Sequence, residues 1–410
     1  MYASSLLVTL IAHVHYVDAM VFRRLPPVHV PISSRALVGA ALRLTRWSDT
    51  AAEAVVAVGA HFPGRSVHLT ASGTAALAAA IQSGHHEAGG REGPLAVALP
   101  AWGCPDLGAA AVALRADIHL YDLDPRTLEP DYSSLRRCLS AGARSVVLVH
   151  FFGRIVDPAP IAALAREFGA TVIEDAAQAA GAFLDGVRAG GLTERGVLSF
   201  GRGKGCNAGG GGALLLTSPF HEDAAPPTAE GRGWTRLLVA AATSWLSHPR
   251  AYWIPAAIPW LGLGDTVYHA LATERRVSPV SLALLPHAMG VVDEMAQGRR
   301  EQLAHWRSHL DEAGVPTIAP AGPRVLDGAL RLPLMLSKSA AAPLRRYGVV
   351  RSYPRGLGSY SQIRARLAHP AQHCPGAEEL ADRLHTLPTH RYVSELDRRV
   401  VVRALAAGGT

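Results

Sequence analysis

Lys204 stands in the glycine-rich run GRGKGCNAGGGG and is one of only two lysines in a chain that has 38 arginines. A lysine amine can lose its proton in a dry site and attack a carbonyl, whereas a guanidinium stays protonated. The second lysine, Lys338, lies in LSKSAA without a supporting motif. Lys204 is therefore a candidate nucleophile, with chance survival of a lysine in an arginine-biased chain as the alternative.

A second candidate motif is SGTAAL, which places Ser72, Gly73 and Thr74 at the start of a predicted helix. The free backbone amides and the dipole at a helix start favour a phosphate, and a hydroxyl adds a donor. Taken alone, the pattern is more often that of an ordinary helix N-cap.

Two further motifs follow predicted strands. IEDAAQAAGA puts Asp175 at a strand end with Gln178 three residues later, and VLSF puts Ser199 just before the Lys204 loop. A carboxylate at a strand end can pair with a buried cation, although a capping aspartate would show the same pattern. The glycines at 209–212 allow the backbone to pass close to a bound ligand.

In combination, these groups match the requirements of pyridoxal 5'-phosphate (PLP). The Lys204 amine would bond to the cofactor aldehyde and then move a proton between the substrate carbon and the cofactor. Asp175 would keep the pyridine nitrogen protonated. The helix-start amides and the nearby hydroxyls would hold the phosphate.

With these motifs the sequence resembles the DegT/DnrJ/StrS-type sugar aminotransferases, a branch of the fold-type-I PLP enzymes. The resemblance covers most of the chain. It runs through SGTAAL (72–77), LPAWGCP (99–105), YDLDPRTLEPD (121–131), VHFFG (149–153), IEDAAQAAGA (173–182), SFGRGK (199–204) and LPTHRYV (387–393).

The resemblance implies a role for each residue of the candidate site. Lys204 is then the Schiff-base lysine, Asp175 the partner of the pyridine nitrogen and Gln178 the neighbour of the ring hydroxyl. The phosphate would then be bound by the Ser72–Thr74 helix start and by Ser199.

The aromatic ring that stacks on the cofactor comes from the LPAWGCP turn. Trp102 is the candidate, although some relatives carry this aromatic at the position that Cys104 occupies. An ordinary core tryptophan is the alternative reading of Trp102.

The sequence departs from the family pattern in two places. It has GGGG at 209–212 where relatives usually carry GEGG. Relatives also supply an asparagine to the neighbouring subunit, whereas the equivalent stretch, TERRVSP (273–279), contains Arg276 but no asparagine. The contact between subunits at the site is therefore left open.

Short apolar runs alternate with helical patterns between residues 66 and 216, which predicts βαβ units and a largely parallel sheet. Ligands of such sheets collect at the carboxyl ends of the strands. We therefore expect an α/β architecture with helices flanking a mostly parallel central sheet, and the resemblance implies that it is of fold type I. The predicted strands are SVHLT (66–70), AVALP (96–100), DIHLYDLD (117–124), SVVLVH (145–150), TVIED (171–175), VLSF (197–200) and ALLL (213–216).

We expect a large PLP-binding domain over 20–270 and a smaller C-terminal α+β domain over 271–410. Residues 1–19 have the features of an over-called extension, with Met20 as the alternative start. A long helical stretch is predicted over 281–312, and GAEELADRLHTLP (376–388) is typical of a helix running into a strand.

An unusually apolar segment, 234–264, follows a polar linker at 221–233. Arg236, His248 and Arg250 interrupt it, so it lacks the 18 or so consecutive apolar residues of a membrane span. A subunit contact or a substrate lid is favoured, and a surface contact with a lipid-linked substrate is left open.

The overall composition limits the classes of binding partner that the sequence suggests. The formal net charge is +7, but no basic run exceeds two residues, which disfavours nucleic acid and suits an anionic small molecule. The four cysteines show no metal-binding spacing, so we expect free thiols, no metal site and a cytoplasmic protein.

The resemblance implies an aminotransferase that acts as a homodimer in surface-polysaccharide or secondary-metabolite biosynthesis. The amino donor would be glutamate and the acceptor a keto sugar, linked to a nucleotide. A sugar dehydratase-like reaction is the first alternative, although that subgroup replaces the Schiff-base lysine with histidine. A non-catalytic PLP-binding regulator is the second.

Overall fold

The computed structural model describes residues 23–46, 50–87, 94–218, 233–272, 276–320, 322–370 and 372–408. The extension predicted at 1–19, the alternative start at Met20, nearly all of the linker at 221–233 and residues 273–275 of TERRVSP lie outside the described residues.

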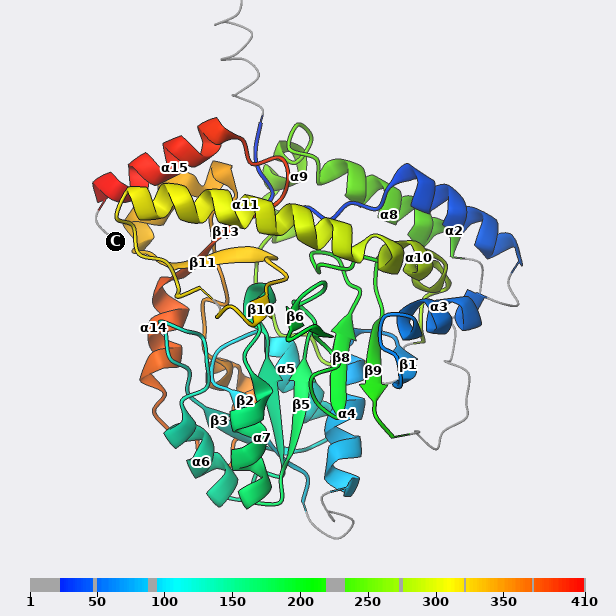
Figure 1. Ribbon diagram of the computed structural model, residues 1–410, viewed down its shortest axis with the longest axis vertical. Helices are drawn as coiled ribbons and strands as arrows, with labels where there is room; N and C mark the ends of the chain where they lie inside the picture. The colour runs from blue at the N-terminus through cyan, green and yellow to red at the C-terminus, as the bar shows by residue number, and fades with distance from the viewer. Residues whose placement is uncertain are drawn as a thin grey trace, which may run out of the picture.

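A seven-stranded sheet forms the centre of the molecule, with strand order β1-β9-β8-β5-β4-β2-β3 (Figure 1). The neighbours from β8 to β3 pair in parallel, and β9 runs antiparallel to both β1 and β8. The mostly parallel central sheet predicted from the sequence is thus confirmed. The strands are β1 (Ser66–Thr70), β2 (Ala96–Pro100), β3 (Asp117–Tyr121), β4 (Ser145–Val149), β5 (Thr171–Asp175), β8 (Arg195–Ser199) and β9 (Gly212–Leu216).

Helices cover both faces of this sheet, with α4 and α5 on one side and α6 and α7 on the other (Figure 1). This layering explains the apolar strand sequences, because every residue of β2 and of β4 is buried. The bounds of these helices are α4 (Gly73–Glu87), α5 (Pro105–Ala113), α6 (Tyr132–Ser140) and α7 (Pro158–Glu167).

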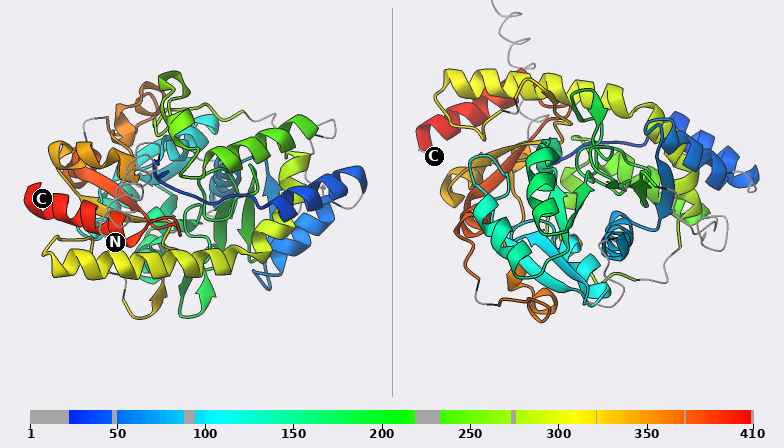
Figure 2. Two further views of the ribbon diagram at one scale, coloured as in Figure 1. Left: turned by 90° about the horizontal axis from the view of Figure 1, so that it is seen from above. Right: turned by 60° about the horizontal axis from the view of Figure 1, so that its bottom comes forward.

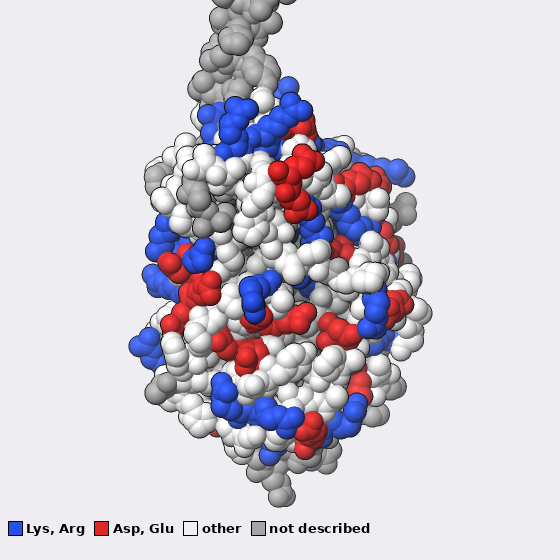
Figure 3. Space-filling view, turned by 60° about the vertical axis from the view of Figure 1, so that its left-hand side comes forward, with Lys and Arg blue, Asp and Glu red and all other residues white. Residues whose placement is uncertain are grey.

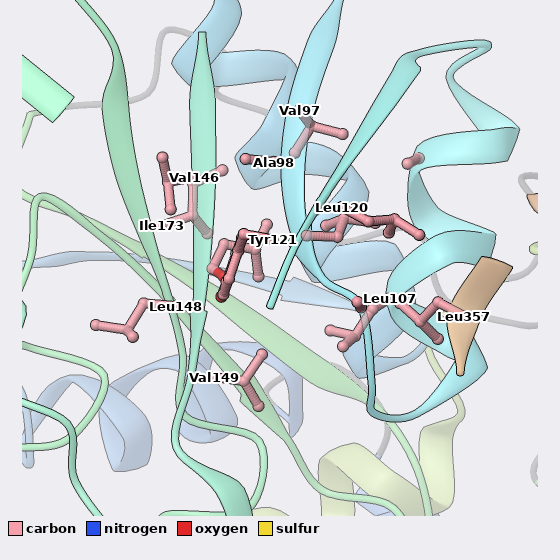
Figure 4. Close-up of a cluster of buried hydrophobic side chains, with 14 of the residues drawn as sticks. Val97, Ala98, Leu107, Leu120, Tyr121, Val146, Leu148, Val149, Ile173 and Leu357 are labelled. Carbon is pink, nitrogen blue, oxygen red and sulfur yellow. The ribbon is translucent and has the colours of Figure 1, made fainter. Parts of the chain in front are cut away.

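The largest hydrophobic cluster lies directly beneath the carboxyl edge of the sheet. Val97, Val146 and Ile173 from three parallel strands belong to this cluster, and Val149 extends it to the end of β4 (Figure 4). Leu357 brings the C-terminal part of the chain into the same cluster. The strand ends that follow are therefore fixed by a common core.

A second group of helices packs at the β1 edge of the molecule. Helix α10 contacts α2, α3 and α8, which brings residues 279–290 into one core with the N-terminal helices (Figures 1 and 2). The bounds are α2 (Ser34–Arg46), α3 (Thr50–Gly59), α8 (Trp234–Leu246), α9 (Trp253–Ala256), the 3₁₀ turn η2 (Pro259–Leu261) and α10 (Pro279–Gly290).

The C-terminal part is a smaller α+β unit reached through the long helix α11 (Figure 1). Its sheet has the order β11-β13-β12 and is antiparallel, and Trp306 of α11 donates its indole N–H to the carbonyl of Pro388 over 2.8 Å. The predicted helix-to-strand transition is confirmed at α14 and β13. The bounds are α11 (Val292–Glu312), β11 (Arg331–Met335), α12 (Lys338–Ala341), η3 (Ala342–Tyr347), β12 (Val350–Arg351), η4 (Leu357–Ser359), α13 (Ser361–Arg364), α14 (Pro375–Arg383), β13 (Leu384–Pro388) and α15 (Glu395–Gly408).

Three small elements complete the fold: β6 (Phe183–Leu184), β7 (Val187–Arg188) and β10 (Val325–Leu326) form a separate three-stranded sheet. On the face of the molecule shown in Figure 3, acidic and basic side chains are interspersed. Within the part of the chain that the structure describes, no helix is long and apolar enough to cross a membrane.

The helical stretch predicted over 281–312 is wrong in one respect. It consists of two helices, because Val291 between them adopts φ −113° and ψ 0° instead of helical angles. Helix α10 is buried along most of its length. Its burial follows from its position between α2, α3 and α8.

Candidate active site

A cavity of about 300 Å³ lies at the carboxyl edge of the central sheet. Seven of the eight predicted site residues line it, and Trp102 does not. These seven come from the ends of three strands and from the start of one helix. They are Ser72, Gly73, Thr74, Asp175, Gln178, Ser199 and Lys204.

The loop that carries Lys204 is held by its own backbone. The carbonyl of Phe200 accepts hydrogen bonds from the N–H groups of both Ala208 and Gly210, and the N–H of Phe200 donates to the carbonyl of Gly211. The side chain of Asn207 donates to the carbonyl of Val30 over 2.7 Å and accepts from the N–H of Gly209 over 3.0 Å. Lys204 therefore projects from a closed loop and not from a flexible glycine linker.

The start of α4 lies against the end of β8, which explains the glycine at position 73. A Cβ added to Gly73 would be 2.7 Å from the Cβ of Ser199 and 2.9 Å from its Oγ. The Ser72 hydroxyl caps the helix by accepting the N–H of Ala75 over 3.1 Å. The helix start thus presents the amides of Gly73 and Thr74 and the hydroxyl of Ser199 within one concave surface.

Asp175 ends β5 on the floor of the cavity and is buried. One of its carboxylate oxygens accepts the N–H of Ala177 over 2.9 Å. Burial raises the pKa of Asp175, while that hydrogen bond and the charge of Lys204 act in the opposite direction. The carboxylate is therefore poised to accept a hydrogen bond from a cationic or N–H-bearing ring.

Gln178 is fixed at both ends of its amide. Its oxygen accepts the N–H of Phe152 over 3.2 Å, and its nitrogen donates to the Tyr353 hydroxyl over 3.2 Å. Phe152 and Tyr353 both have left-handed backbone angles, with φ of 59° and 46°, and their rings stack 6.3 Å apart. Strain of this kind in non-glycine residues is typical of functional sites, where the surroundings hold the backbone in place.

The prediction that Trp102 stacks on a cofactor does not fit its position. The side chain is fully buried, and its indole N–H donates to the carbonyl of Tyr353 over 2.9 Å. It packs against the ring of Phe151 at 5.2 Å, and Phe151 is the aromatic residue that lines the cavity. The alternative reading of Trp102 as a core residue is the one that the structure favours.

Among the cavity residues that were not predicted as site residues, three have polar or ionisable side chains: Cys104, Asp106 and Arg202. Burial raises the pKa of the Cys104 thiol to about 12, and Asp106 adds to the effect, so the thiol stays protonated. Lys204 then remains the candidate nucleophile of the cavity. The signal for Cys104 was already present in the LPAWGCP turn, where relatives can carry the aromatic at this position.

The buried histidine near the site has a structural role. His150 follows β4, and its Nδ1 accepts the N–H of Val156 over 3.2 Å. Its Nε2 therefore carries the proton and donates to Glu174 over 3.0 Å. Glu174 also accepts the N–H of Leu192 over 2.8 Å, so the pair ties the loop after β7 to the sheet.

A second, larger cavity of about 820 Å³ adjoins the first and shares Arg202 and Gly211 with it. Arg236 and Arg276 also line it. Arg276 is the residue that TERRVSP retains from the family's cross-subunit stretch. Three guanidinium groups around one cavity favour an anionic ligand beside the Lys204 site.

The residues of the smaller cavity fit PLP. The start of α4 with the neighbouring Ser199 hydroxyl suits a phosphate, Asp175 suits the ring nitrogen, and the Lys204 amine suits the aldehyde. A hydrophobic core would not explain these residues, because a buried carboxylate and an amine both face the cavity.

Known proteins resemble the chain over most of its length. The profile of the DegT/DnrJ/EryC1/StrS aminotransferase family matches residues 59–406. A pleiotropic regulatory protein of Geobacillus stearothermophilus is 24% identical over 70% of this chain and 70% of its own length. A UDP-N-acetyl-3-dehydro-alpha-D-glucosamine 3-aminotransferase of Acidithiobacillus ferrooxidans is 25% identical over 65% of each chain.

Solved structures share the fold. The sugar aminotransferase CalS13 of Micromonospora echinospora superposes with a TM-score of 0.70 at 22% identity, covering 94% of this chain and 100% of that one. Fold, cavity and profile agree, and the chain belongs to the DegT/DnrJ/EryC1/StrS family of PLP-dependent aminotransferases.

Proposed function

We propose that this protein transfers the amino group of glutamate to a nucleotide-linked keto sugar, with PLP held by Lys204. The observation that carries the proposal is the convergence of the Lys204 amine, the Asp175 carboxylate and the start of α4 on one cavity. Amine, carboxylate and helix start come from separate segments, and each suits a different part of the same cofactor.

PLP, when bound, supplies an aldehyde and an electron-accepting ring. The Lys204 amine would first hold the aldehyde carbon. Once an amino acid has displaced it, the same amine would take the proton from the donor's Cα and return it at the cofactor's C4'. Asp175 would accept the ring N–H and keep that nitrogen charged, since its carboxylate lies in the same buried space.

The phosphate would lie against the start of α4. The amides of Gly73 and Thr74 would donate to its oxygens, and the Ser199 hydroxyl would add a further donor. Ser72 would support the phosphate site indirectly, because its hydroxyl caps α4 by accepting the N–H of Ala75.

The acceptor would occupy the cavity beside the cofactor. Arg202, Arg236 and Arg276 line that cavity, and guanidinium groups suit the phosphates of a nucleotide-linked sugar. The aminotransferase from Acidithiobacillus ferrooxidans is named for a UDP-linked keto sugar, which supports this class of acceptor. A homodimer is part of the proposal, since family resemblance implies that subunits meet at the site.

The test begins with the absorbance of the purified protein incubated with PLP. We expect the visible band of a lysine-bound aldehyde in the wild-type protein and its loss in Lys204→Ala. Lys204→Arg is the matched control, because it keeps the charge but cannot bond to the aldehyde. A wild-type protein that takes up no PLP would refute the proposal.

The donor half-reaction gives a separate readout. Glutamate should shift the spectrum to the aminated cofactor and release 2-oxoglutarate, with glutamine as the comparison. In Asp175→Asn, PLP should still bind, and the half-reaction should slow by at least about 100-fold because a preorganised charge is lost. An Asp175→Asn variant as fast as wild type would remove Asp175 from the proposed mechanism.

A regulatory role is the second candidate, favoured by the likeness to the pleiotropic regulatory protein. It predicts that PLP binds through Lys204 while neither glutamate nor glutamine alters the spectrum. Release of 2-oxoglutarate from glutamate separates the two candidates.

A further inference from the structure

Helix α8 has its apolar side turned outward. Trp234, Leu238, Ala242 and Trp245 follow one another at helical spacing along its exposed face, with Leu238 70% and Trp245 65% exposed. Only Leu237 and Ala240 of this helix are buried. A helix that packs on a core normally shows the opposite arrangement, so the outer face of α8 is suited to another apolar surface.

The apolar face continues beyond α8, and we call it the α8–η2 face. Trp253 and Ile254 are exposed on α9, and Trp260 on η2 is 85% exposed. Val38 and Leu42 are exposed on α2, which contacts α8 (Figures 1 and 2). The chain has seven tryptophans, and four of them lie exposed between 234 and 260.

The charges on this segment all have one sign. Residues 234–264 contain no aspartate or glutamate, and they contain Arg236 and Arg250. Arg236 lines the cavity beside the Lys204 site, on the side of α8 away from Leu238 and Trp245. Arg250 is exposed and forms no ion pair with any residue that the structure describes. The face therefore combines tryptophan with unopposed positive charge.

A cavity of about 930 Å³ beneath α9 adds to this charge. Arg24, Arg345 and Arg355 line it together with Leu263 of the same segment, and Asp265 is the acidic residue in this lining. These three guanidinium groups also have no ion pair among the described residues.

We propose that the α8–η2 face docks on a lipid bilayer that carries anionic headgroups. Indole rings prefer the level of the headgroups, and arginines at that level gain from anionic lipid. The segment would lie on the bilayer and not cross it, in keeping with its short, interrupted helices.

A second copy of this chain fits the face less well. In a two-fold contact the same surface meets itself. The contact would then oppose Arg250 to a segment that holds no acid. Anionic headgroups supply the missing negative charge, and a symmetric partner does not.

The experiment is flotation of the full-length protein with vesicles of phosphatidylcholine alone or of equal parts phosphatidylcholine and phosphatidylglycerol. Wild type should float with the mixed vesicles, and its tryptophan emission should shift to the blue. The variant Leu238→Gln/Trp245→Gln/Trp260→Gln should bind at least tenfold more weakly, and Arg250→Gln about fivefold more weakly.

Val187→Gln/Leu326→Gln is the matched control, because both residues are large, apolar and exposed on the small β6–β7–β10 sheet. It should bind vesicles as wild type does. Thermal unfolding checks that every variant is folded, and wild type alone already tests the proposal.

Wild type that stays with the protein fraction for both vesicle types would overturn the proposal. Equal loss of binding in the control variant would do the same. Light scattering tests the alternative that a second copy covers the face. If the triple variant forms a smaller oligomer than wild type, and wild type binds no vesicles, the α8–η2 face is assigned to a second copy. None of these readouts depends on aminotransfer.

Discussion

At the level of single residues, the tightest constraint in the site is the contact between Gly73 and Ser199. We predict that Gly73→Ala lowers the free energy of unfolding by about 1–3 kcal/mol, because its Cβ would lie 2.7 Å from the Cβ of Ser199. Urea unfolding measures the effect. The affinity for PLP should fall as well, since the helix start must shift away from β8.

Two further variants make this prediction specific. Ser199→Gly removes the atoms that the new Cβ would meet, so the double variant should lose less stability than the two single losses combined. Gly298→Ala is the matched control: nothing lies within 4 Å of its Cβ in α11, and it should stabilise by about 1 kcal/mol. Strict additivity in the double variant would contradict the contact.

At the residue level, the structure brings together in one cavity the groups for which motif and chemistry pointed the same way. Lys204 and Asp175 could be selected because an amine and a strand-end carboxylate each had neighbours that suit one cofactor. The direction of the Trp102 side chain could not be predicted, because the turn at Gly103, with φ 152°, sends successive side chains in different directions. Phe151 reaches the cavity from another strand end, which no spacing within LPAWGCP reveals.

At the level of elements, the loop from Phe200 to Gly211 depends on Asn207, the only asparagine in the chain. Asn207→Ala removes its hydrogen bonds to Val30 and Gly209, at a cost of about 1 kcal/mol each. We expect slower bonding of PLP to Lys204, with the thermal transition of the whole molecule little changed. Stopped-flow absorbance measures the rate.

Thr193→Ala is a suitable control for the loop variant. It also removes a hydrogen bond from a loop, the one that its hydroxyl donates to the Arg195 carbonyl, but it does not line the cavity. The prediction fails if both variants slow PLP bonding equally.

Element types could be predicted well because buried parallel strands leave near-continuous apolar runs between helical patterns. AVALP and TVIED match β2 and β5 to the residue. The break at Val291 could not be predicted, since it reflects how α10 fits between other helices. The outward apolar side of α8 was also hidden, because hydrophobic periodicity shows that a helix has a face but not which way the face points.

At the level of the whole molecule, a histidine cluster joins three distant segments. His29 hydrogen-bonds to the Ser247 carbonyl, and His390 donates to the Pro26 carbonyl over 2.9 Å. Their rings lie 5.8 Å apart. Burial lowers the pKa of each histidine to about 4, and repulsion between them contributes for His29.

This cluster should make stability depend on pH. A depressed histidine pKa means that the unfolded chain binds protons that the folded chain does not, between about pH 6.5 and pH 4. We predict that the free energy of unfolding falls over this window as the pH is lowered, by an amount on the order of a few kcal/mol. Urea titrations at several pH values measure the slope.

The variant His29→Gln/His390→Gln should show a flatter slope across the same window, whatever its stability at neutral pH. His373→Gln is the control, because that histidine is exposed and remote from the cluster. An unchanged slope in the double variant would exclude the cluster as the cause.

The cavity around Lys204 is built from segments that begin at Ala71 and end at Gly211, and no one segment holds more than part of it. In the unfolded chain these segments have no fixed relation, so a small molecule that requires all of them can bind only the native state. Such a molecule stabilises the fold by mass action, by about 4 kcal/mol at a thousand times its dissociation constant. The visible absorbance of the bound cofactor would therefore report the folded state. On heating, it should be lost over the same temperature range in which the central sheet unfolds.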